Sequence, residues 1–139
     1  MEKHIDDNCI FCKLANGQIP TNSIYEDDDF KVILDAAPAA KGHAIILPKT
    51  HAANLFELPE EYGAKIFAIA KKCGKAIKDT YNYDGLNVLQ NNGEAAGQTV
   101  FHLHVHLIPR MNDDNIGIKW AQGECVDGEK IAEEIKKNL

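Results

Sequence analysis

The sequence predicts an α+β domain in which a five-stranded antiparallel sheet carries one long helix and a short N-terminal helix. Two observations lead to this prediction. Five short apolar segments are separated mostly by short turns, as in antiparallel sheets. One longer stretch, residues 58–82, repeats apolar side chains at helical spacing. The chain of 139 residues suits one hydrophobic core, and we expect a single domain over 1–139.

The strands are predicted from apolar runs bounded by Gly, Pro, Asn and Asp. They cover residues 23–26, 30–34, 43–49, 85–92 and 99–109. The first two form a hairpin around Asp27-Asp28. Small residues between Gly93 and Gln98 form the loop that precedes the fifth strand.

The helices are predicted from apolar spacing and from their end signals. Residues 9–20 contain one or two helical turns that stop near Gly17. The long helix has Pro59 in its first turn, followed by acidic residues that complement the helix dipole. Its apolar face is built from Tyr62, Ile66, Ile69 and Cys73, with Phe67, Ala70 and Ile77 close by. A cysteine on this face is expected in the core.

The two ends of the chain lie outside the predicted core. Residues 1–8 are polar and mostly charged, and we expect them to be mobile. Residues 111–139 form a C-terminal extension, in which a terminal helix begins near Asp127.

Composition and charge exclude several classes of protein. The formal net charge is −6 without a long Lys/Arg run, so we expect no nucleic-acid partner. An anionic ligand is still compatible with this charge where local donors bind it. No stretch is apolar for long enough to cross a bilayer, and the start lacks the apolar segment of a signal peptide. We therefore expect a cytoplasmic protein with no membrane partner, and four cysteines are too few for a disulfide scaffold.

Half of the six histidines occupy alternate positions in the fifth predicted strand, as His102, His104 and His106. Because side chains alternate along a strand, Phe101, Leu103, Val105 and Leu107 would face the core and the histidines the opposite side. A solvated strand face is one alternative, and a catalytic metal bound by the row is another. The outer two backbones stand roughly 13 Å apart, while zinc–nitrogen bonds measure about 2.0–2.1 Å. Two neighbouring histidines could share an ion, but all three could not.

The central histidine suits a nucleophile that attacks phosphorus. A neutral imidazole is competent when one nitrogen is free and the other holds its proton in a hydrogen bond. The preceding loop offers backbone amides and small residues that allow close approach to a phosphate. Asn91, Gln98 and Thr99 add neutral donors. The alternative for this loop alone is a plain connection.

A pair of cysteines, Cys9-x-x-Cys12, has the spacing of zinc ligands. The chain has no second C-x-x-C, and the pair does not open the long helix as a thioredoxin-like redox motif would. Histidines such as His51 and His102 could complete a tetrahedral site. The alternative is two buried thiols without a metal. His4 and His43 lack such a context and are expected at the surface or in loops.

Together these segments resemble the histidine-triad (HIT) family. The stretch HLHVHLI fits the pattern His-φ-His-φ-His-φ-φ, where φ is apolar, and the chain is most similar to the zinc-carrying bacterial members of the Hint-like branch. The segments CIFCKLANGQIP, YEDDDFKVILDAAPAAKGHAIILPKTH and NNGEAAGQTVFHLHVHLIPR also follow the family's order.

The resemblance implies a homodimer with a continuous sheet and nucleotide hydrolase or transferase chemistry at the α-phosphate. It favours hydrolysis of a purine nucleoside phosphoramidate through a nucleotidyl-histidine intermediate. The alternatives are a dinucleoside polyphosphate hydrolase and a non-catalytic nucleotide-binding module.

The resemblance also implies the roles of individual residues. His104 would be the nucleophile, the carbonyl of His102 would hold its proton, and His106 would contact the scissile bridge. The nucleotide-binding residues would be Ile10, Phe11, Leu14 and Ile19 at the base, Asp35 at the ribose, and Asn91, Gly97, Gln98 and Thr99 at the phosphate. A structural Zn²⁺ would be bound by Cys9, Cys12, His51 and His102. Two features depart from the family pattern, the long C-terminal extension and the small Ala36 after Asp35.

Overall fold

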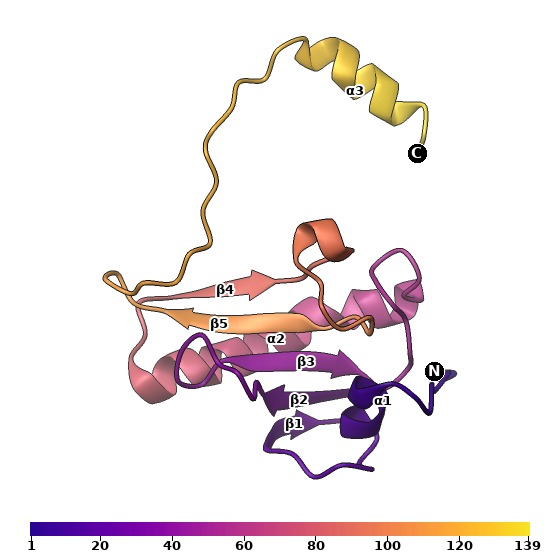
Figure 1. The fold of residues 1–139 in the computed structure, drawn as a ribbon, viewed down its shortest axis with the longest axis vertical. Helices are drawn as coiled ribbons and strands as arrows, with labels where there is room; N and C mark the ends of the chain where they lie inside the picture. Colours follow the sequence, from indigo (N-terminus) through magenta and orange to yellow (C-terminus); the bar gives the residue numbers. More distant parts are fainter.

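A computed structural model describes all residues, 1–139. Five strands form one antiparallel sheet in the order β1-β2-β3-β5-β4 (Figure 1). The strands are β1 (Ser23–Glu26), β2 (Phe30–Leu34), β3 (Ala44–Pro48), β4 (Gly85–Leu89) and β5 (Val105–Arg110). The predicted α+β fold class is confirmed, and the β1–β2 hairpin has the predicted bounds.

Helices lie on both sides of the sheet. The helices are α1 (Ile10–Ala15), α2 (Glu60–Tyr81), the 3₁₀ turn η1 (Glu94–Ala96) and α3 (Gly128–Lys136). The long helix α2 crosses one face, and α1 packs on the other (Figure 1). No helix is both long and apolar enough to span a membrane.

Strand β3 is buried along its whole length because both of its faces are covered. Ile46 joins the main core with α2, whereas Ile45 and Leu47 pack toward α1. This explains why β3 is a continuous apolar run rather than an alternating one. Cys73 of α2 is buried in the main core, as expected. Phe67 departs from the prediction, because its side chain is 76% exposed.

The fifth strand is shorter than predicted. It begins at Val105, and residues 99–104 bend away from regular pairing. The last pair on β3 is Ile46–Val105. In the same register Leu47 would face His104 and Pro48 would face Leu103, and Pro48 has no N–H to donate to the ladder. Leu103 bonds instead to the carbonyl of Ala52, at 2.7 Å. Phe101 is consequently 52% exposed, and its predicted place in the core is wrong.

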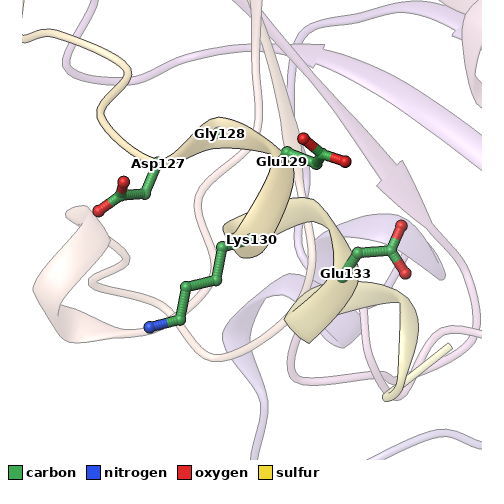
Figure 2. A pocket seen from close by; sticks show the side chains of 5 residues that line it. All are labelled: Asp127, Gly128, Glu129, Lys130 and Glu133. Carbon is green, nitrogen blue, oxygen red and sulfur yellow. The ribbon is translucent and has the colours of Figure 1, made fainter.

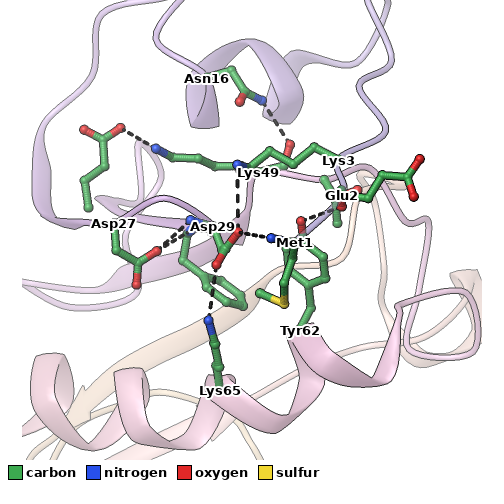
Figure 3. Close-up of polar contacts among 12 residues, drawn as sticks. Met1, Glu2, Lys3, Asn16, Asp27, Asp29, Lys49, Tyr62 and Lys65 are labelled. Atoms are coloured by element: carbon green, nitrogen blue, oxygen red, sulfur yellow. Dashed lines mark hydrogen bonds and ion pairs between the residues drawn. The ribbon is translucent and has the colours of Figure 1, made fainter.

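The N-terminal segment runs beside β3 and α2. The backbone N–H of His4 donates to Thr50 Oγ1 at 2.9 Å, and the Tyr62 hydroxyl donates to the carbonyl of Glu2 at 2.8 Å. Lys3 of the N-terminal segment and Lys65 of α2 approach the buried carboxylate of Asp29, at 3.8 and 3.2 Å (Figure 3). The mobility expected of residues 1–8 stays a prediction.

The C-terminal extension leaves the sheet at Arg110. Its guanidinium donates twice to Asp114, each at 2.8 Å, and once to Asn87 Oδ1 at 2.7 Å. Beyond this anchor the chain is extended as far as Asp127, and α3 stands apart from the sheet (Figure 1). The helix begins at the predicted position, and none of its residues is buried. The hollow at its first turn is lined only by polar residues and Gly128 (Figure 2) and lies far from the histidine row.

Candidate active site and metal site

The histidine row is divided between two neighbouring sites. His104 and His106 line a hollow of about 560 Å³ on the α1 side of the sheet. The His102 side chain is 0% exposed and turns toward the cysteine pair. The alternation predicted for all three holds only for His104 and His106, because His102 lies in the bend at residues 100–102 before β5.

His104 is held in one tautomer by the backbone carbonyl of His102. Its Nδ1 lies 2.8 Å from the carbonyl oxygen of His102. A carbonyl can only accept a hydrogen bond, so Nδ1 carries the proton and Nε2 keeps its lone pair. When its ring is neutral, His104 therefore presents the nucleophilic Nε2 beside the hollow.

His106 is held in the opposite tautomer by a chain of hydrogen bonds through His43. The backbone N–H of Ala39 donates to His43 Nδ1 at 2.9 Å, so the proton of neutral His43 lies on Nε2. That Nε2–H donates to His106 Nδ1, also at 2.9 Å. The proton of neutral His106 is therefore on Nε2. His106 offers a hydrogen-bond donor at the hollow beside the His104 lone pair.

Burial keeps both members of this chain neutral. Loss of solvent, with smaller contributions from nearby His104 and His43, lowers the pKa of His106 to about 4. Burial also lowers the pKa of His43, although the carboxylate of Asp35 opposes this effect. The tautomers assigned above consequently persist at neutral pH.

Asp35 closes this network at the edge of the hollow. Its Oδ2 lies 3.5 Å from His43 Nε2 and 3.8 Å from His106 Nδ1, and its Oδ1 accepts from the Ala37 N–H at 2.8 Å. These three side chains lie within 4.8 Å of one another, as metal ligands do. The Ala39 N–H argues against a metal here, because it places the proton of His43 on the nitrogen that would have to bind the ion.

The loop after β4 borders the hollow with Gly97 and Thr99. Gly97 has φ +95, a conformation that residues with a side chain rarely adopt, whereas a Cβ at this position would make only an ordinary contact of 3.5 Å with Asn91 Nδ2. Gln98 is buried and holds the loop itself. It accepts from the Gly93 N–H at 2.8 Å and donates to the carbonyls of Ala53 and Val100.

The opposite wall of the hollow is apolar. Phe11 and Leu14 of α1 contribute to it, together with Ile33 and Ile45 of the sheet. Ile10 lies on the far side of α1, in a second hollow shared with Cys9 and His51. Ile19 is not among the residues that line either hollow.

The cysteine pair meets two histidines next to the hollow. Cys9, Cys12, His51 and His102 each offer a ligand atom, and these atoms lie within 4.8 Å of one another. His102 Nδ1 is 3.4 Å from each cysteine Sγ, and His51 Nδ1 is 3.5 Å from Cys12 Sγ. A tetrahedron with ordinary Zn–S and Zn–N bonds has S···N edges of about 3.6 Å. The donor set and its spacing therefore fit zinc.

The surroundings of the cluster also suit a metal. His102 Nε2 donates to the carbonyl of Pro48 at 2.9 Å, which leaves Nδ1 without a proton and ready to coordinate. Burial raises the pKa of the Cys12 thiol to about 11. A bound metal would displace that proton, as metal binding to a thiol requires.

Comparison with known proteins decides the family. A model of the HIT domain matches residues 16–113. This chain belongs to the HIT family. An adenosine 5'-monophosphoramidase of Schizosaccharomyces pombe is 42% identical over 136 residues, which are 93% of this chain and 99% of that relative.

Solved HIT structures share the fold. A HIT family protein from Bacillus subtilis has a TM-score of 0.88 at 40% identity and covers 96% of this chain and 98% of its own. A zinc-bound histidine triad family protein from Mycobacterium smegmatis has a TM-score of 0.75 at 33% identity, with coverage of 95% and 98%.

The HIT motif alone does not reveal the part played by His43. This histidine is expected at the surface or in a loop. It does lie in the loop just before β3, but it is 5% exposed and bonded to His106, so a surface position is wrong. His106 lies 63 residues away in the sequence, and the pairing of β3 with β5 brings the two rings together. The one local signal is its position at the start of a fully apolar strand, where a polar residue requires a buried partner.

Proposed function

We propose that this HIT protein hydrolyses purine nucleoside phosphoramidates at the α-phosphate through a covalent nucleotidyl intermediate on His104. The observation that carries the proposal is the hydrogen bond from His104 Nδ1 to the carbonyl of His102, which leaves Nε2 free at the hollow. The names of three yeast relatives, each an adenosine 5'-monophosphoramidase, support the substrate class.

The first step forms the covalent adduct. The lone pair of His104 Nε2 attacks phosphorus, and the bond from phosphorus to the amine breaks as the amine takes a proton from solvent. The Nδ1 proton stays bonded to the His102 carbonyl, which stabilises the positive charge that develops on the ring. The Nε2–H of His106 donates a hydrogen bond to the bridging atom while negative charge builds there, and His106 keeps its proton.

The second step returns the enzyme to its starting state. Water attacks phosphorus and loses a proton to solvent, while the bond from phosphorus to His104 Nε2 breaks. The nucleotide is released and Nε2 recovers its lone pair. Covalent catalysis divides one high barrier into two lower ones. Asn91, Gly97, Gln98 and Thr99 form the proposed phosphate loop. Asn91 and Thr99 would supply uncharged donors to the non-bridging oxygens, Gly97 would allow their close approach, and Gln98 holds the loop in place through its amide.

The rest of the nucleotide follows from the two walls of the hollow. Asp35 is proposed to accept hydrogen bonds from the ribose hydroxyls. Phe11 and Leu14 would pack on the purine. Ile10 and Ile19 do not line this hollow, and a contact of either with the base stays a prediction from the family resemblance. Of these residues, the two on α1 that line the hollow have the most direct support.

We also infer that Cys9, Cys12, His51 and His102 hold a structural Zn²⁺. Zinc at this position would tie α1 to the segments that follow β3 and precede β5, and it supplies no chemistry to the reaction. The zinc-bound relative from Mycobacterium smegmatis supports this inference. A cytoplasmic location is proposed as well.

A homodimer is part of the proposal. Strand β4 is at the edge of the sheet, and large apolar side chains near it and on α2 are exposed, namely Leu55, Phe56, Phe67 and Val88. Edge strands with apolar neighbours are natural pairing surfaces. Sedimentation of the purified protein should give twice the mass of one chain.

The function is tested with adenosine phosphoramidate and the variants His104→Ala and His104→Gly. The native protein should release AMP, and mass spectrometry of a quenched reaction should detect a nucleotidyl adduct on His104. Both variants should lose turnover by several orders of magnitude. Near-normal turnover in either variant would overturn the proposal.

The same assay separates the alternatives. Preference for a dinucleoside polyphosphate would favour the polyphosphate hydrolase, and nucleotide binding without turnover would favour a non-catalytic module. A zinc hydrolase that uses two histidines of the row would stop turning over on chelation while its fold stays intact.

A further inference from the structure

The short helix α1 contacts the proposed nucleophile directly. The Phe11 ring lies 4.9 Å from the His104 ring, centroid to centroid, with the two planes at 88°. It also lies 6.1 Å from the His102 ring at 77°. An edge-to-face pair of this kind resists tilting of either ring. The hydrogen bond to the His102 carbonyl holds only the Nδ1 side of His104. The rest of the ring is held between Phe11 and His106, whose ring also lies 4.9 Å away at 72°, so Phe11 supplies the restraint that comes from α1.

Phe11 itself is placed between two ligands of the proposed metal. Cys9 is the N-cap of α1, and Cys12 lies in its first turn. A six-residue helix has little stability alone, because nucleation is costly and few hydrogen bonds repay it. Its other attachments are the apolar contacts of Phe11, Leu14 and Ala15 with the sheet and the bond from Asn16 Nδ2 to the Lys49 carbonyl at 3.1 Å. Apart from the Phe11 side chain itself, these lie toward the C-terminal end of the helix, so the cysteines are the main anchor of the backbone turn that carries Phe11.

The same cluster reaches His104 by a second route. The ring of His102 lies against both cysteine sulfurs, and its carbonyl oxygen accepts the Nδ1 proton of His104. Two groups that touch the nucleophile, the Phe11 ring and the His102 carbonyl, are therefore attached to one cluster.

We propose that Phe11 is a positioning residue for His104, and that the Cys9–Cys12–His51–His102 cluster, when it holds its metal, sets the Phe11 ring and the His102 carbonyl together. The cluster then acts on the nucleophile through the chain's own residues, without contact between metal and substrate. The kinetic consequence rests on the proposed function, whereas the orientation of the His104 ring does not.

The kinetic test compares two residues of the same helix and the same wall. Phe11→Leu keeps an apolar side chain but removes the ring, and kcat should fall about threefold to tenfold, the range expected for one lost aromatic pair. Phe11→Tyr keeps the ring and should restore most of kcat. Leu14→Ala shortens a side chain that lines the hollow without a ring contact to His104, and its main effect should be a higher KM, with a smaller fall in kcat than that of Phe11→Leu. An effect of Phe11→Leu on KM alone would overturn the positioning role.

The spectroscopic test needs no substrate and no activity. In ¹⁵N-labelled, metal-loaded protein at fixed neutral pH, the His104 ring should show one tautomer, protonated at Nδ1, with proton shifts displaced by the Phe11 ring. Cys9→Ser with reduced metal content should show mixed tautomers of His104 and a smaller ring-current shift. Phe11→Leu should show the smaller ring-current shift but keep the single tautomer. Cys125→Ser, which changes an exposed thiol on the C-terminal extension, is the matched control and should match the native spectrum.

The outcomes separate the two proposals. An unchanged His104 spectrum in folded, metal-depleted Cys9→Ser would overturn the role of the cluster. If the native protein shows no phosphoramidase activity but the spectra are as expected, the proposed function is overturned and the positioning of His104 stands.

Discussion

His43 Nε2 and His106 Nδ1 lie 2.9 Å apart, and the Ala39 N–H donates to the other nitrogen of His43. This relationship sets the direction of every proton in the chain from Ala39 to the hollow. His104 and His106, two residues apart on one strand face, consequently present a lone pair and an N–H side by side. An attack on phosphorus requires both, one to form the new bond and one to assist the bond that breaks.

The first prediction concerns His43. Replacing it with Ala removes the donor that holds His106 Nδ1, so His106 will sample both tautomers and present its N–H for only part of the time. We expect kcat for phosphoramidate hydrolysis to fall about tenfold or more, a loss typical of a removed hydrogen bond in a catalytic network. His43→Gln retains an amide donor and should lose less. Equal losses in the two variants, measured by steady-state kinetics, would show that hydrogen bonding by His43 is not the reason.

The second prediction is the dependence of stability on pH. The folded pKa of His106 lies at about 4, below the ordinary value of 6.5, so the unfolded chain binds this proton more readily. The stability that His106 contributes is present above about pH 6.5 and is lost as the pH falls toward 4. The loss should be on the order of 3 kcal/mol for this one histidine.

Chemical denaturation at a series of pH values measures this effect. His106→Gln, which cannot take up the proton, should flatten the change in unfolding free energy between pH 6.5 and 4. A curve as steep as that of the native protein would place the acid sensitivity elsewhere.

The third prediction concerns metal removal. A metal that binds only the folded state at a thousandfold excess over its dissociation constant stabilises by about 4 kcal/mol. Chelation should therefore lower Tm by roughly 10 °C in a domain of this size. Cys12→Ser should show the low Tm even without chelator and should bind less zinc by elemental analysis. Cys73→Ala should lose stability from the core but keep its metal, because Cys73 lies in the α2 core rather than in the cluster.

The fourth prediction uses two glycines of α2. A Cβ on Gly74 would lie 2.5 Å from Leu86 Cδ2, whereas a Cβ on Gly63 would make an ordinary contact of 3.9 Å with Leu58 Cδ2. Alanine favours a helix over glycine by about 1 kcal/mol, and displacement of a packed side chain costs about 1–3 kcal/mol. Gly63→Ala should therefore raise the free energy of unfolding above that of the native protein. The free energy of unfolding of Gly74→Ala should be lower than that of Gly63→Ala by at least about 1 kcal/mol. The reverse order in urea denaturation would contradict the packing of α2 on β4.

Local patterns predicted much of the fold. The β1–β2 hairpin, the start of α3 and the body of α2 follow from turn residues, apolar spacing and end signals within a few residues of each element. The Cys9-x-x-Cys12 spacing and the two-residue spacing of His104 and His106 are likewise local, so the candidate roles of these residues could be predicted from the sequence. The partners of Cys9 and Cys12 required either the family resemblance or the folded chain.

The tertiary structure decided what depends on distant partners. Pro48 ends the ladder on which β5 could have continued, and this turns His102 out of the strand and toward the cysteines. The burial of His43 arises because β3 pairs with β5 and Asp35 ends the neighbouring strand. The sequence by itself determined which residues can carry the chemistry, since their types and spacings are local. The proton of His104 is held by a carbonyl two residues away, but that of His106 was decided only by folding, because its partner His43 lies 63 residues away and reaches it through the pairing of β3 with β5.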